Sequence, residues 1–167
     1  MHLYRRMYTY VKGFQTMSAD ASLGPEDCNC FMVRSAARHV TQLYDHFLAP
    51  AGLHVTQFSI LSKLKRLGRM TINALAEEML MDRTTLGRNI LPLERDRLIK
   101  IEASATDRRA KDLHLTKAGE KRLQAGRDAW TRAQLRFEDR FGAKRAADFR
   151  AILRAVVASD LAADLRN

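Results

Sequence analysis

The pattern of apolar and polar positions is most informative between residues 71 and 115. Apolar residues recur three and four positions apart in 72–79 and again in 83–95, which predicts two short helices, each with one buried face. Thr71 and Asp82 stand directly before these segments, where a side-chain oxygen can cap the first helical turn. The few residues between the two segments are enough for the turn of a helix-turn-helix.

The next part of the chain alternates apolar and polar residues. Segments 98–104 and 111–116 both show this period of two, which is typical of half-buried strands. The loop between them contains Asp107, Arg108 and Arg109, which predicts a β-hairpin with exposed guanidinium groups at its tip. A short strand at 69–71 is expected to pair with this hairpin.

Helical spacing outside this region predicts four longer helices. They cover 31–49, 56–67, 117–141 and 143–161, and Thr56 is the expected cap of the second. The sequence therefore predicts a mainly α fold with a small β-hairpin (α+β).

The expected organisation has four parts. Residues 1–27 form a flexible leader, because they lack periodicity and contain a small, polar stretch; a basic-aromatic arm is the alternative. Residues 28–55 hold the first helix, 56–116 the helix-turn-helix with its hairpin, and 117–167 the last helices. The apolar seams of the outer helices favour a dimerisation layer, although they can also complete the monomer's own core.

Composition narrows the class of protein. The formal net charge of +10 and the pI of about 10.1 favour a polyanionic partner, with a generally basic surface as the alternative. No apolar run is long enough for a bilayer, and no secretory signal is evident, so a cytoplasmic protein is expected. Two cysteines cannot form a disulfide framework.

Several motifs carry a resemblance to a known family. They are Thr85-x-x-Arg88, Leu93-Glu94 followed by Leu98-Ile99, Asp107-Arg108-Arg109, and Leu115-Thr116-x-x-Gly119. Together they resemble the MarR family of bacterial winged helix-turn-helix transcription regulators. The likeness extends more weakly from about Cys28 to about Asp164. It implies that 28–55 and 117–167 form the dimerisation helices.

Two residues depart from what this resemblance and helix chemistry favour. Arg97 stands where the family usually has glycine, which accepts the positive φ of a helix end, so Arg97 is expected either to end the helix differently or to be strained. Pro92 lies inside the second short helix, where it predicts a kink or an early loosening.

The exposed face of the 83–95 helix is the predicted DNA-reading surface. Arg88 is the candidate for a bidentate contact to guanine, and Arg109 for insertion into the minor groove with Asp107 as its orienting partner. The other candidates are expected to reach base edges or phosphates. They are Arg83, Thr84, Thr85, Asn89, Arg95, Arg108 and Lys111.

Other candidate sites compete with ordinary packing. An effector pocket for a small, aromatic acid is implied by the family, with core packing as the alternative for each residue. Its candidates are Arg38, His39, Tyr44, His46, Phe47, Phe58 and Trp130. Cys28 and Cys30 can sense oxidant or bind a metal, but structural or incidental cysteines are favoured. A helix would point the two apart, which disfavours a disulfide within the chain and leaves a bond between subunits open. No metal-ligand spacing or catalytic constellation is present, so no metal, cofactor or enzymatic activity is expected.

The predicted function follows from these sites. We expect a homodimeric, sequence-specific regulator, a repressor released by a small ligand, that binds a pseudo-palindromic double-stranded operator and no membrane. The alternatives are a thiol-based redox regulator and a winged-helix architectural or interaction protein with little sequence specificity.

Overall fold

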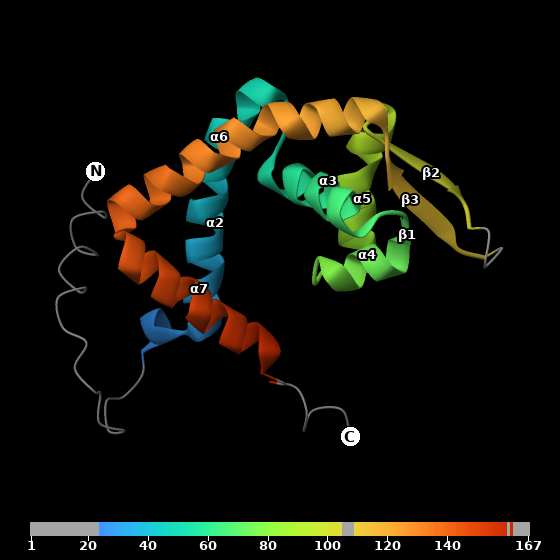
Figure 1. Cartoon of the computed structure of the whole chain (residues 1–167). Coiled ribbons are helices and arrows are strands. Elements are labelled where there is room, and N and C mark those ends of the chain that lie inside the picture. Colours follow the sequence, from blue (N-terminus) through green and yellow to red (C-terminus); the bar gives the residue numbers. More distant parts are fainter. Residues whose placement is uncertain (1–23, 105–108, 160, 162–167) are drawn as a thin grey trace, which may run out of the picture. The chain divides into compact units, whose positions relative to one another are not determined.

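A computed structural model describes residues 24–104, 109–159 and 161 (Figure 1). The chain divides into two units, Met1–Arg38 and His39–Asn167. The first contains the 3₁₀ turn η2 (Pro25–Asp27) and the beginning of helix α2 (Asn29–Leu48), whose remainder belongs to the second.

The second unit has the predicted order of elements. After α2 come η3 (Ala49–Ala51), α3 (Val55–Leu67), β1 (Met70–Thr71), α4 (Ile72–Glu78), α5 (Arg83–Arg95), β2 (Ile99–Ala103), β3 (Lys111–Leu115), α6 (Lys117–Phe141) and α7 (Ala143–Ala158). The fold class is therefore confirmed: helices predominate, and one small antiparallel sheet takes a strand from before the helix-turn-helix and two from after it. The largest shift is in α7, which ends three residues before the predicted 161.

The sheet has the strand order β1-β3-β2, and both pairings are antiparallel. β1 pairs with Asp112 and Leu113 of β3, whereas β2 pairs with β3 along its whole length and forms a hairpin with it (Figure 1). On one face of the sheet Ile99 and Leu113 are buried against the core. The other face carries charged side chains.

The core confirms the predicted inner faces of α3 and α5. Phe58 and Leu61 are buried from α3, and Leu86 and Leu93 from α5. The predicted inner face of α7 is wrong for this chain alone, because several of its apolar side chains are exposed. They are Ile152, Val156 and Val157.

Two of the three predicted helix caps are confirmed. Thr71 Oγ1 accepts a bond of 3.1 Å from the backbone amide of Ala74. Asp82 Oδ1 accepts one of 2.8 Å from the amide of Thr85, and bonds from Thr85 hold the pKa of Asp82 below its usual value. These caps fix where α4 and α5 begin.

The predicted cap at Thr56 is wrong, because α3 already begins at Val55. The amide of Val55 donates to Asp45 Oδ1 at 2.7 Å, and the amide of His54 donates to Gln57 Oε1 at 2.9 Å. One of the side chains that satisfy the start of α3 thus comes from α2, ten residues earlier, and the other, Gln57, comes from α3 itself.

Arg97 ends the turn after α5 in the left-handed region, with φ of 57°. The amides of Arg97 and Leu98 donate to Glu94 O at 2.9 Å and to Leu93 O at 2.8 Å, which closes the helix. Arg97 is therefore strained rather than differently folded, at a cost of about 1–2 kcal/mol. Pro92 does not end the helix, which continues to Arg95.

Aromatic and polar contacts join α6 to α7 within the second unit. The rings of Phe137, Phe141 and Phe149 lie with centroids 5.3–6.4 Å apart. Arg150 Nη1 donates to Glu138 Oε1 at 2.9 Å, across the Gly142 corner. Because α6 also packs on α3 through Phe58 and Trp130, these contacts make the two C-terminal helices part of the same unit as the helix-turn-helix.

Candidate functional site

Helix α5 divides into a buried and an exposed face, as predicted. Leu86, Ile90 and Leu93 are buried, while Thr84 and Arg88 are exposed. Arg83 and Thr85 are exposed as well, at the capped end of the helix. No described residue forms a hydrogen bond or an ion pair with Arg88, so its five N–H donors are available to a ligand.

Two of the predicted contact residues are held by the protein itself. Asn89 Nδ2 donates to the carbonyl oxygen of Thr85 at 2.8 Å, in its own helix. Arg95 Nε lies 3.0 Å from Asp96 Oδ1. Both side chains would have to exchange these bonds for a ligand, so they are weaker candidates than Arg88.

The hairpin brings further predicted residues to the surface. Arg109 and Lys111 are exposed on the segment that leads into β3. Asp107 and Arg108 lie outside the described residues, and the expected Asp107–Arg109 pair therefore stays a prediction.

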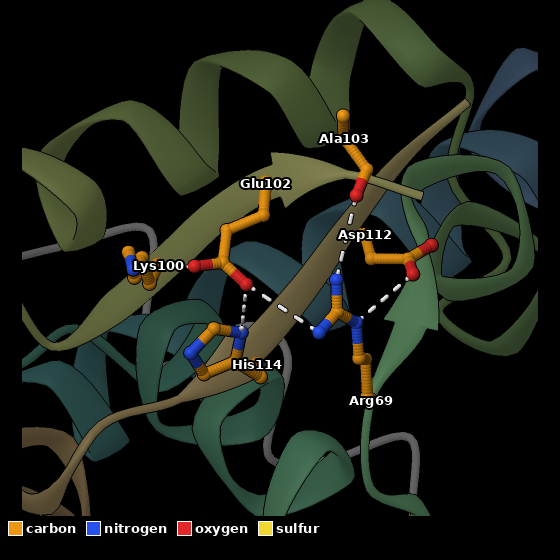
Figure 2. Close-up of polar contacts among 6 residues, drawn as sticks. All are labelled: Arg69, Lys100, Glu102, Ala103, Asp112 and His114. Carbon is orange, nitrogen blue, oxygen red and sulfur yellow. Dashed lines mark hydrogen bonds and ion pairs between the residues drawn. The ribbon is translucent and has the colours of Figure 1, made fainter. Parts of the chain in front are cut away.

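Arg69 was named from the sequence only as the start of an expected strand, with no functional role. It precedes β1, and its guanidinium lies over the polar face of the sheet (Figure 2). Its Nε donates to Asp112 Oδ2 at 2.9 Å, Nη1 lies 3.4 Å from Glu102 Oε2, and Nη2 donates to the carbonyl oxygen of Ala103 at 3.5 Å. Asp112 is among the buried residues, whereas the Arg69 side chain that pairs with it stays partly exposed.

Two further basic side chains lie near the carboxylate of Glu102 on the same face of the sheet. Lys100 is bonded to it and is the main cause that lowers the pKa of Glu102 below its usual value. His114 Nδ1 lies 3.8 Å from the same carboxylate, which is beyond hydrogen-bond distance (Figure 2). The strand register explains the grouping, since Lys100 faces His114 and Glu102 faces Asp112.

A second candidate site is an open hollow of about 450 Å³ between α3 and α6. Phe58 and Trp130 stack there with centroids 6.1 Å apart, and Trp130 is 38% exposed. Lys63 and Arg66 supply positive charge at the rim. Sequence reasoning named the two aromatic residues but missed both cations, which recur on α3 at helical spacing.

The other predicted effector residues do not line this hollow. Tyr44 donates to Gln134 Oε1, and burial raises its pKa. His46 meets Phe47 edge to face, at 5.7 Å between centroids, and His39 is exposed. In the first unit, Arg38 Nη2 donates to Ser35 Oγ of its own helix at 2.9 Å. Of the predicted effector residues, Phe58 and Trp130 are the two that line the hollow described above.

Both cysteines are free and exposed. Cys28 stands before α2, which begins at Asn29, so the argument that a helix points the pair apart does not apply to it. The role of the pair stays a prediction.

The described part of the chain has neither a membrane-spanning helix nor a metal-binding cluster. None of its helices is both long and apolar enough to cross a bilayer. In the same residues, no three His, Cys, Asp or Glu side chains gather where they could hold a metal ion.

Known proteins resemble this chain in both sequence and fold. A sequence profile of the MarR family matches residues 51–110. The transcriptional regulator MosR of M. tuberculosis, solved in complex with DNA, is 34% identical, with a TM-score of 0.68 over 80% of this chain and 99% of that one. The chain belongs to the MarR family. It is therefore a DNA-binding transcriptional regulator of the winged helix-turn-helix type.

More distant MarR-like structures share the fold. A variant of E. coli MarR in complex with operator DNA is 16% identical, with a TM-score of 0.69 over 76% of this chain and 91% of that one. Bordetella bronchiseptica BpsR, whose DNA binding is regulated by 6-hydroxynicotinic acid, is 16% identical, with a TM-score of 0.73 over 83% and 99%. Curated protein sequences gave no match.

Proposed function

We propose that this MarR-family regulator is a homodimeric repressor that reads a pseudo-palindromic operator. In this proposal α5 enters the major groove, where Arg88 contacts a guanine, and Arg109 enters the adjacent minor groove. The observation that carries it is the exposed, unpaired Arg88 on the capped helix that packs beside the hairpin. Arg83, Thr84, Thr85 and Lys111 are then placed to contact the backbone or base edges.

The homodimer is supported by apolar side chains that a single chain leaves exposed. Within α7, Ile152 is 58% and Val157 61% exposed, and both belong to one amphipathic helix. Phe31, in the first unit, is 56% exposed on α2. Exposed apolar groups on two helices are typical of surfaces that another protein covers, and a two-fold dimer would match a palindromic site.

The hollow beside Trp130 supports a small-molecule effector. Its aromatic walls and the two cations Lys63 and Arg66 suit a planar acid, because the ring would stack while the carboxylate meets positive charge. BpsR has a related fold, and its DNA binding is regulated by 6-hydroxynicotinic acid, an aromatic acid. Lys63 already pairs with Glu78 of α4 at 2.7 Å. A bound acid would therefore compete with Glu78 for Lys63, and α4 belongs to the helix-turn-helix.

This effector site can be tested by fluorescence, because Trp130 is the chain's one tryptophan. Titration with 6-hydroxynicotinic acid is expected to change its emission, and Arg66→Gln is expected to weaken that binding about tenfold by removing one charged donor. The matched control is Lys65→Gln, the neighbouring cation on α3, which pairs with Glu120 outside the hollow. Equal effects of the two variants would contradict a specific carboxylate contact.

Selection of duplexes from random DNA tests the proposed regulator against a winged-helix architectural protein. One enriched palindrome is expected. Binding without enrichment would favour the architectural alternative, since backbone contacts carry no sequence information.

A further inference from the structure

Arg69, which directly precedes β1, links that strand to β2 and β3. The hairpin of β2 and β3 with its connecting segment is called the wing below. From its position before β1, Arg69 meets Asp112 on β3 and both Glu102 and the carbonyl oxygen of Ala103 on β2 (Figure 2). Ala103 pairs with Lys111 in the outermost pair of the hairpin. Arg69 therefore contacts the two outermost pairs of the strand register, Glu102–Asp112 and Ala103–Lys111. Arg109 lies two residues before Lys111 in the chain.

The hairpin has little other support at this level. β1 ends its pairing at Asp112, so the described residues place no third strand beside the Ala103–Lys111 pair, and the next bond outward is between the hairpin's own strands, from the amide of Ser104 to the carbonyl oxygen of Ala110 at 3.0 Å. Beneath it lies an unfilled space of about 360 Å³, whose walls include Gly87 and Leu91 of α5 together with Ile101 and Ala103 of β2. A two-stranded hairpin alone is only marginally stable, and here the outer end of β2 lines this hollow, whereas Ile99 at its inner end is buried in the core.

We propose that Arg69 is a positioning residue for the wing. Its guanidinium ties the outer hairpin to the base of the sheet and so sets the direction in which Arg109 is presented to DNA. The planar fork suits this role, because it bonds two carboxylates and a carbonyl in fixed directions, which a lysine ammonium cannot do. The inference rests on the proposed minor-groove role of Arg109.

The competing role for Arg69 is a direct contact with a DNA phosphate, since its side chain is 44% exposed. The two roles differ in what they predict. A phosphate contact lowers affinity on every sequence, is largely kept by lysine, and adds to the effect of losing Arg109. A positioning residue acts through Arg109, so its loss matters only where Arg109 matters. We expect that to be on A·T-rich flanks, because their narrow minor groove concentrates negative potential and attracts an inserted arginine.

The test measures the affinity of the full chain for one operator with A·T-rich or G·C-rich flanks. Arg69→Ala and Arg69→Lys are each combined with Arg109→Ala in a double-mutant cycle. We expect each Arg69 variant to weaken binding to the A·T-flanked duplex about tenfold and to change the G·C-flanked duplex much less. In the Arg109→Ala background, the Arg69 variants are expected to add little. Lys65→Ala, which removes a cation on α3 away from the wing, controls for net charge.

Each outcome decides between the two roles. Losses that are equal on both flanks, or that add to Arg109→Ala, would overturn the positioning role, as would an Arg69→Lys variant that binds like the parent. If Arg109→Ala alone shows no preference between flanks, the proposed role of the wing fails instead. Should Arg69→Ala unfold because Asp112 loses its partner, Arg69→Lys, which keeps the charge, still decides the question.

Discussion

Replacing Arg88 by alanine is expected to weaken binding to the preferred operator by about 1–3 kcal/mol and to relax discrimination at one base pair. The expected cause is the loss of a bidentate contact from a side chain that is exposed and has no described partner in the protein. Equilibrium titration of the parent and variant against the operator and its single-base changes measures both effects.

Arg95→Ala is the matched comparison on the same helix. Arg95 already lies 3.0 Å from Asp96, near the helix end, and is expected to meet phosphate, so its loss should weaken binding evenly across sequences. If Arg88→Ala also weakened all sequences evenly, Arg88 would be only a phosphate contact and the base-reading role would be wrong.

The largest expected effect on folding comes from Gly119→Ala. A Cβ built at Gly119 would lie 2.0 Å from the carbonyl oxygen of Leu98, a backbone atom that also accepts from the amide of Thr116 at 3.1 Å. Relief would require α6 to move off the turn that follows α5. We expect a loss of about 3 kcal/mol in the free energy of unfolding, measured by urea titration.

Gly87→Ala is the control for this prediction. A Cβ at Gly87, inside α5, meets nothing within 4 Å, so alanine is expected to stabilise the helix by about 0.5–1 kcal/mol. A Gly119→Ala variant as stable as the parent would show that the contact between α6 and Leu98 is not tightly fixed.

The elements that could be predicted are those whose signals are local. The caps Thr71 and Asp82 act on amides three residues later, and the strand alternation follows from side chains that point to opposite faces. The start of α3 was placed one residue late because its N-cap is His54, which pairs with Gln57, and because a further bond to its first turn comes from Asp45 on another helix. Such a tertiary bond leaves no periodic trace in the sequence.

The candidate site shows the same division. Arg88 was predicted because helical spacing alone places it opposite a buried face. Arg69 was missed because its partners are 33 and 43 residues away and come together only when the three strands pair. Lys63 and Arg66 were missed because nothing local tells which exposed cations lie beside Trp130. The requirement for glycine at position 119 appeared in the motif, and the contact with Leu98 now explains it.

Footprinting of the selected operator, combined with light scattering of the protein–DNA complex, tests the central claim most directly. Two protomers related by a two-fold axis should present their α5 helices to successive major grooves, about 34–36 Å apart. The account therefore predicts two protomers on each duplex and two equivalent protected half-sites roughly one helical turn apart. A single protected half-site with one protomer bound would contradict it.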